Sequence, residues 1–335
     1  MTGLERTLCF IKGEAVDHPP FHPIIMRWAA KQAGVKYSDF CLDPYTKCRA
    51  MSQCASDYGI DWVTVMSDPW AEASAFGIRV DYPEDNLPID IGGHFQDAAS
   101  AAMIKKYDVR SNLRCSNRLT EISEFKRMHG KDLFIVGWVE GPVAEYVDLR
   151  KATEAAVDFF LDPDSVLMAM DTIVESAMQF ITLQIEAGAH CIGIGDAFCS
   201  QIGPELYENF AFARQKILVD HIHKSGALAK LHICGNTESI LPSMISTGAD
   251  IIDIDHLVSS MTDFLPLLRK GQVFSGKADP VSVIQEGTID KIRREVAEDF
   301  RQANGRTIIS AGCEITPGTS RENMKAFMNA AFEIK

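Results

Sequence analysis

The sequence lacks a long hydrophobic run: nowhere in its 335 residues do about 18 apolar side chains follow one another, so we expect no membrane-spanning segment. Its N-terminus has no basic segment followed by an apolar one, and we expect no signal peptide. Positive charge is also scarce, because 33 Lys and Arg oppose 46 Asp and Glu, which gives a net charge of −13. Such a chain repels nucleic acids and anionic membranes, and we expect neither as a partner.

Motifs of several large enzyme classes are missing as well. There is no phosphate-binding loop, nucleophile elbow or kinase signature, and the pair Gly193-x-Gly195 is too short for a dinucleotide fingerprint. No repeat or low-complexity linker divides the chain. Hydrophobic residues make up 46% and charged residues 24%, as in ordinary globular proteins. We therefore expect a single domain over residues 1–335.

Nine cysteines, an odd number, are spread through this acidic chain. Disulfide frameworks use even numbers of cysteines in short secreted chains, so the pattern indicates free thiols in a reducing compartment. We accordingly expect a cytoplasmic protein. Most free cysteines pack in the core like small hydrophobic residues, so a functional cysteine must be identified by its neighbours.

Short apolar segments alternate with longer helical patterns along the chain. They end at Gly, Pro or Asp and are typical of strands that are buried on both faces. The eight predicted strands cover residues 21–26, 61–66, 133–138, 191–195, 227–234, 251–255, 272–276 and 307–312. Apolar spacing and end signals predict helices over residues 165–188, 204–226, 259–271, 289–305 and 320–332.

Eight strands that alternate with helices predict an α/β fold, a closed (β/α)8 barrel of the TIM type. An open doubly wound sheet is the alternative, because short apolar runs do not distinguish strands from helix fragments. The segment 79–131 fits the alternation poorly, since it contains Pro83, Pro88, Gly92 and Gly93. We interpret it as an insertion after the second strand.

Reactive side chains gather at the carboxyl ends of the predicted strands, where the active site of such a barrel lies. They are Asp68, Glu140, Asp196, His232, Cys234, Asp255, His256, Lys277, Asp279, Cys313 and Glu314. Asp253 and Asp255 share one face of their strand, so Asp255 borders the site if that face lines the barrel. For Asp68 and Asp196, a role as turn residues competes with a role in catalysis.

The segment Leu231-His232-Ile233-Cys234-Gly235 is the sharpest of these signals. Residues two apart on a strand point to the same side, so His232 and Cys234 face together. Cys313 stands at the equivalent end of a later predicted strand. One imidazole and two thiolates form the Cys2His set of a catalytic zinc site with an open fourth position. The alternative is two packed thiols beside a hydrogen-bonded core histidine.

Three segments carry a resemblance to a known family: 195–202 (GDAFCSQI), 232–237 (HICGNT) and 312–323 (GCEITPGTSREN). They resemble the uroporphyrinogen decarboxylase superfamily, and within it the methyltransferase branch typified by methylcobamide:coenzyme M methyltransferases. The resemblance extends from about residue 4 to residue 331 and implies a (β/α)8 barrel. It also implies that His232, Cys234 and Cys313 are the zinc ligands.

The activity that the resemblance implies is methyl transfer between a corrinoid and a small molecule. The corrinoid, a cobalamin, would be carried by a small partner protein, and the small molecule would be a methyl donor or an acceptor such as the thiol coenzyme M. We expect Asp68 and Asp196 to orient the substrate or the corrinoid partner. We assign Asn236, Asp255 and Lys277 to contacts with the cofactor.

Two other functions remain open at this point. A decarboxylase of porphyrinogens needs no metal, but it needs several arginines to hold the substrate carboxylates. The matching stretch here, residues 26–34, keeps only Arg27. A non-catalytic tetrapyrrole-binding protein would keep the fold and tolerate the loss of His232 and Cys234.

Overall fold

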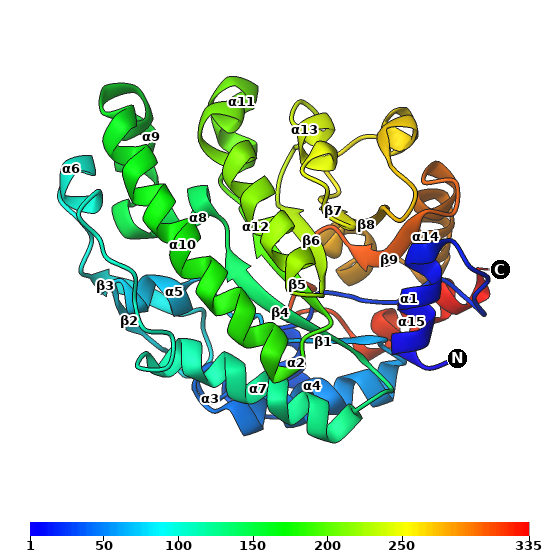
Figure 1. The fold of residues 1–335 in the computed structure, drawn as a ribbon. Coiled ribbons are helices and arrows are strands. Elements are labelled where there is room, and N and C mark those ends of the chain that lie inside the picture. Colours follow the sequence, from blue (N-terminus) through cyan, green and yellow to red (C-terminus); the bar gives the residue numbers. More distant parts are fainter. Residues whose placement is uncertain (335) are drawn as a thin grey trace.

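The computed structural model describes residues 1–334 and has an α/β fold. Seven parallel strands form one sheet that curls like part of a TIM barrel, with neighbours in the order β1-β4-β5-β6-β7-β8-β9 (Figure 1). They are β1 (Trp62–Thr64), β4 (Phe134–Glu140), β5 (Cys191–Gly195), β6 (Leu228–Ile233), β7 (Ile251–Ile254), β8 (Val273–Ala278) and β9 (Thr307–Ala311). Because this order has no reversal, the sheet differs from a doubly wound one.

Helices lie outside this sheet, and both chain ends lie on the same side of the molecule (Figure 1). The helices are α1 (Gly3–Lys12), α2 (Arg27–Ala33), α3 (Tyr37–Leu42), α4 (Pro44–Tyr58), α5 (Trp70–Ala75), α6 (Ala98–Ala101), α7 (Leu113–His129), α8 (Pro142–Arg150), α9 (Ala152–Leu161), α10 (Pro163–Ala187), α11 (Cys199–Leu206), α12 (Ala213–Lys224), α13 (Leu241–Ser246), α14 (Ile289–Gln302) and α15 (Arg321–Glu333). Irregular helical turns are η1 (Tyr207–Phe212), η2 (Thr262–Leu267) and η3 (Pro280–Gln285).

The first predicted strand, over residues 21–26, is wrong, whereas the seven later predicted strands are confirmed. Phe21 forms only an isolated parallel bridge to Ile309 of β9. Pro20 and Pro23 have no backbone N–H to donate, which prevents a continuous ladder here. The segment still reaches both edge strands, because His22 N donates to Ile309 O (2.9 Å) and Asp61 N donates to Phe21 O (3.0 Å).

Two of the predicted helices differ from those in the structure. The helix over residues 165–188 is confirmed as α10, and Gly188 ends it in a left-handed conformation. The helix over 204–226 is divided into α11, η1 and α12, because Gly203 breaks the helical backbone ahead of Pro204. The helix over 259–271 is wrong: only the short 3-10 turn η2 forms there, and it contains Pro266.

The segment 79–131 is not set apart as one insertion. Its first part forms a two-stranded antiparallel ribbon of β2 (Arg79–Asp81) and β3 (Ile89–Gly92), separate from the main sheet. Its last part is α7, which packs against α4, α10 and β4 as a connecting helix of the barrel does. The proline and glycine residues therefore mark the ribbon and not the whole segment.

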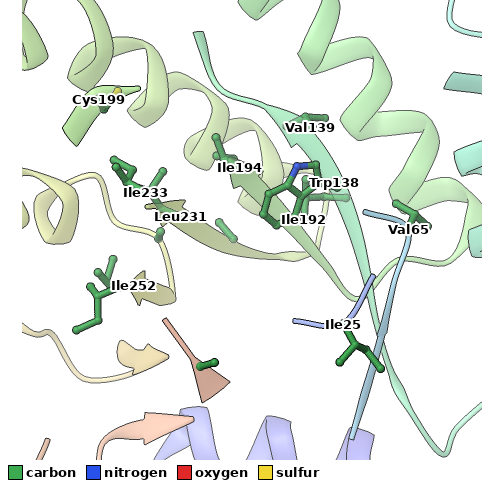
Figure 2. Close-up of a cluster of buried hydrophobic side chains, with 14 of the residues drawn as sticks. Ile25, Val65, Trp138, Val139, Ile192, Ile194, Cys199, Leu231, Ile233 and Ile252 are labelled. Carbon is green, nitrogen blue, oxygen red and sulfur yellow. The ribbon is translucent and has the colours of Figure 1, made fainter. Parts of the chain in front are cut away.

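Glycines on β5 give the barrel its shape next to β4. Ile192 and Ile194 of β5 are fully buried in the apolar cluster of Figure 2. Gly193, which lies between them, pairs in register with Trp138 of β4. A Cβ at Gly193 or Gly195 would lie 2.3 or 2.5 Å from the nearest Trp138 ring atom. The Gly193-x-Gly195 pair therefore accommodates an indole ring.

Among the described residues, α10 is the one helix that is long and apolar enough to cross a membrane. Half of its apolar window is buried, and it packs against α7, α8 and α12. Such burial is typical of a core helix.

Candidate metal centre

The ends of β6 and β9 bring one imidazole and two thiols together. His232 is the second-last residue of β6. Cys234 directly follows that strand, and Cys313 lies just after the end of β9. His232 Nε2 lies 2.8 Å from Cys234 Sγ, and the two sulfur atoms are 3.5 Å apart. All three ligand atoms lie within 4.8 Å of one another, as in the coordination shell of a single metal ion.

The chemistry of this donor set fits zinc. Two thiolates and one imidazole are ligands that zinc, a borderline-soft metal ion, prefers. Three protein ligands with an open fourth position are typical of catalytic zinc sites. The other ring nitrogen of His232, Nδ1, lies 2.8 Å from Asp253 Oδ2. A carboxylate at this position fixes the ring so that Nε2 faces the metal.

Hydrogen bonding already favours a thiolate in this cluster. Hydrogen bonds from Cys234 and His232 lower the pKa of the Cys313 thiol to about 4, against the opposing effect of burial. Burial favours the neutral ring of His232, but the nearby Asp253 carboxylate raises its pKa to about 9. A divalent metal would displace the protons that these groups share.

Asp253 and Asp255 of the β7 segment support the cluster from one side. The register of β6 and β7 places His232 opposite Asp253, which also lies 2.9 Å from the Lys230 ammonium nitrogen. Asp255 Oδ2 accepts a hydrogen bond from Gly235 N (2.8 Å). Asp255 therefore holds the turn that follows Cys234, where Gly235 has a φ of 91°.

A cavity of about 160 Å³ opens onto the three ligands. Its walls are mainly apolar, and three carboxylate residues complete the lining. The apolar part is formed by Ile24, Met26, Met66, Pro69, Trp138 and Ala197. The carboxylates belong to Asp68, Glu140 and Glu314.

Asp68, which we expected to act on the substrate, lies in this lining and is nearly fully buried. Its carboxylate is paired with the Arg114 guanidinium and accepts a hydrogen bond from Ser67 Oγ (2.7 Å). Burial raises the pKa of Asp68, but Arg114 and Arg118 outweigh it and hold the pKa below its usual value. Asp68 is therefore a fixed negative charge on the cavity wall.

Other predicted site residues are not brought into the cavity. Asp196 is fully buried behind the wall, where it accepts hydrogen bonds from Ala144 N and Gln215 Nε2 (both 2.7 Å). Asn236 accepts a hydrogen bond from Glu238 N within its own loop. Lys277 donates to Ser259 O and lies 3.8 Å from Asp299 Oδ1. Asp196, Asn236, Lys277 and Asp255 are absent from the described lining.

Sequence reasoning missed Trp138 and left Glu140 without a role. Trp138 Nε1 donates to Glu140 Oε1 (2.9 Å), and both side chains line the cavity. The signal for the tryptophan was the Gly193-x-Gly195 pair on the neighbouring strand, which leaves space for a large ring. For Glu140, the signal was its place at a strand end.

Comparisons with known proteins identify the family to which this chain is similar. The family model of uroporphyrinogen decarboxylase (URO-D) matches residues 2–334. Uroporphyrinogen decarboxylase of Synechococcus sp. (strain CC9605) is 27% identical over 345 residues, covering 96% of this chain and 94% of the relative. Methylcobamide:CoM methyltransferase of Methanosarcina mazei is 27% identical over 278 residues, covering 82% of this chain and 80% of the relative.

Solved structures also match along the whole chain. A methyltransferase from Methanosarcina mazei has a TM-score of 0.88 at 22% identity, covering 99% of this chain and 98% of that one. A B12-independent methionine synthase from Shewanella sp. W3-18-1 has a TM-score of 0.61 at 11% identity, with 94% of both chains covered. At such low identity these matches establish the fold alone.

Proposed function

The chain belongs to the uroporphyrinogen decarboxylase family, and within this family we propose that it is a zinc-dependent methyltransferase. It would move a methyl group between a corrinoid, carried by a small partner protein in the cytoplasm, and a small-molecule thiol. The observation that carries this proposal is the cluster of His232, Cys234 and Cys313 at the wall of a cavity.

The proposed reaction balances as a heterolytic methyl transfer. The thiol sulfur forms a bond to the methyl carbon, the cobalt–carbon bond breaks, and its electron pair stays on cobalt, so that Co(III) becomes Co(I). The thiol proton is released to solvent. When bound by His232, Cys234 and Cys313, zinc would lower the pKa of a substrate thiol at its open position and make the sulfur nucleophilic at neutral pH.

Residues of the chain would prepare the site for this step. Asp253 fixes the tautomer and orientation of His232, and Asp255 fixes the turn after Cys234. The apolar walls limit access of water to the sulfur, which raises its reactivity. Asp196 would act from behind the wall as a positioning residue, since it ties the end of β5 to the start of α8.

The cavity argues against decarboxylation of a porphyrinogen. Its volume of about 160 Å³ lies below the range of about 300–1,000 Å³ usual for larger ligands, and a tetrapyrrole is larger than most of them. A porphyrinogen also needs cations for its carboxylates. Arg27, which lies at the start of α2, directs its guanidinium to Glu314 at 3.6 Å, so its charge is already balanced.

The test is a methyl-transfer assay with zinc-loaded protein. Free methylcobalamin would be supplied with a panel of thiols and with tetrahydrofolate, and formation of Co(I) would be followed by its absorption. We expect demethylation by at least one thiol and its loss in Cys234→Ala, whereas the remote variant Cys9→Ala should keep the rate. If no acceptor demethylates methylcobalamin, and no methyl donor methylates Co(I) in the reverse assay, the proposal is wrong.

A further inference from the structure

The charge around the cavity is unusual for a site that would bind an anion. Its lining contains three carboxylates, and neither Lys nor Arg is among the described residues that form it. Two of these carboxylates are balanced by cations behind the wall: Arg114 pairs with Asp68, and Arg27 approaches Glu314 through both its backbone N–H (2.9 Å) and its guanidinium.

Glu140 differs from the other two carboxylates. Only 9% of the residue is exposed, and its Oε1 accepts the hydrogen bond from Trp138 Nε1. Within residues 1–334, Oε2 has no hydrogen-bond donor and no ion-pair partner. Arg118 lies nearby, but its guanidinium pairs with Glu72 Oε2 at 2.9 Å. Glu140 therefore presents an unpartnered oxygen at the wall of the cavity.

Further acidic side chains surround Glu140. Glu145 of α8 is 1% exposed, and neither of its carboxylate oxygens has a partner in the described part of the chain. The Glu72 carboxylate makes no hydrogen bond to the Glu140 side chain. Its Oε1 accepts a hydrogen bond from the backbone N–H of Glu140 (3.1 Å). Burial, together with the carboxyl groups of Glu72 and Asp148, raises the pKa of Glu140 well above its ordinary value, and Arg118 opposes this effect only in part. A positive charge in the cavity would favour the ionised form of Glu140 and pair with it, whereas a negative charge would oppose its ionisation.

Trp138 adds a second element that favours a cation. Its indole packs over Gly193 and Gly195 on one strand and lines the cavity next to Glu140. The faces of aromatic rings attract ammonium groups, most strongly in sites that exclude water. An unpartnered carboxylate beside an indole is a suitable receptor for a small organic cation.

We propose that Glu140, together with Trp138, selects a small thiol or thioether that carries an ammonium group, in preference to an anionic one. This inference rests on the proposed function for the sulfur chemistry, and it adds the substrate class. Glu140 would be a specificity-determining residue that touches the substrate. The same charge distribution disfavours the sulfonate of coenzyme M as the natural partner of the site.

The test uses three thiols that share a two-carbon chain and differ in charge. Cysteamine carries an ammonium group, 2-mercaptoethanol a hydroxyl group, and 2-mercaptoethanesulfonate a sulfonate. Binding to the zinc-loaded protein would be measured by calorimetry at neutral pH, and kcat/KM with methylcobalamin would be measured separately. We expect cysteamine to bind about ten- to a hundredfold more tightly than 2-mercaptoethanol, the usual range for a hydrogen bond to a charged group. The sulfonate should bind most weakly.

The variant Glu140→Gln isolates the charge, because glutamine keeps the size of the side chain and the oxygen that accepts from Trp138. It should remove most of the preference for cysteamine over 2-mercaptoethanol, which is measured as the ratio of the two affinities in the same variant. The control is Glu238→Gln, a partly exposed carboxylate after β6 that accepts a hydrogen bond from Ser259 N and does not line the cavity. It should keep the preference of the wild type.

The outcomes separate this inference from the proposed function. If cysteamine is preferred only because its amine chelates the zinc ion, the preference will persist in Glu140→Gln and the inference is wrong. It is also wrong if the sulfonate binds as tightly as cysteamine to the wild-type protein. If none of the thiols demethylates methylcobalamin, the proposed function fails, whereas the order of binding still decides the role of Glu140.

Discussion

Asp253 Oδ2 lies 2.8 Å from His232 Nδ1, on the neighbouring strand and in register with it. The contact leaves His232 Nε2 directed at the sulfur of Cys234, 2.8 Å away. Both residues are at least 95% buried, so water does not compete strongly for the imidazole. Asp253 is thus a link between the metal centre and Lys230, the buried cation on its other side.

Replacing Asp253 with asparagine should weaken zinc binding about 10- to 100-fold, the usual effect of losing the carboxylate behind a histidine ligand. It should also cost about 3–5 kcal/mol of stability, because Lys230 would remain buried without its partner. Chelator competition measures the first effect and urea unfolding the second. In the double variant Asp253→Asn/Lys230→Met, stability should recover while zinc binding remains weak. Unchanged zinc affinity in Asp253→Asn would contradict the assigned role.

Zinc content tests the ligand set directly. We expect about one zinc per chain, since the cluster offers a single Cys2His set. Cys234→Ala and Cys313→Ala should each lose nearly all of it in elemental analysis of the purified protein. Cys9→Ala, which alters a thiol remote from the cluster, should retain it. Undiminished zinc in either ligand variant would show that the metal binds elsewhere.

The unpartnered Glu145 predicts a pH dependence of stability. Burial, reinforced by Glu72, raises its pKa well above the ordinary value. The folded protein then holds a proton that the unfolded chain releases above pH about 4.3, so this group makes stability fall as the pH rises toward its folded-state pKa. Glu145→Gln removes the effect and should stabilise the protein at pH 8 by roughly 1–3 kcal/mol, with a flatter pH profile. Thermal unfolding between pH 5 and about pH 8 measures both.

A second buried glutamate is the control for this experiment. Glu121 is fully buried and lies 3.0 Å from the equally buried Lys47 ammonium nitrogen. Glu121→Gln leaves that cation unpaired and should destabilise the protein by about 3–5 kcal/mol. If both variants shift stability in the same direction, the distinction between a paired and an unpaired carboxylate does not hold here.

The Gly195→Ala variant tests how Trp138 is held. The new Cβ would lie 2.5 Å from Cζ2 of the indole, so the ring must move toward the cavity. We expect a loss of about 1–3 kcal/mol in unfolding free energy, typical of overpacking, and a lower kcat/KM. Zinc content should not change, because no ligand is displaced. The smaller ring in Gly195→Ala/Trp138→Phe should restore stability, and failure to restore it would place the strain elsewhere.

The sequence by itself determined the seven strands that follow residue 60 and the shared face of His232 and Cys234. Both depend on local rules, because apolar segments between turn residues form buried strands and alternate residues point to one side. The Cys2His composition was also visible without a structure. Local rules failed at residues 21–26, where prolines leave too few donors for a ladder, although the segment still bonds to both edge strands.

Only the tertiary structure decided which strand-end side chains reach the cavity. Asp68 and Glu140 line it, whereas Asp196, at the end of the strand next to Glu140, turns away to bind Ala144 N and Gln215. Strand position alone could not separate them, because a side chain beyond the last paired residue follows the backbone of its own turn and the partners that helices bring to it. The guanidinium groups that pair with Asp68 and Glu314 belong to Arg114 and Arg27, which lie on helices distant in the sequence and meet these carboxylates only in the folded chain. Glu140 has no such ion-pair partner among the described residues.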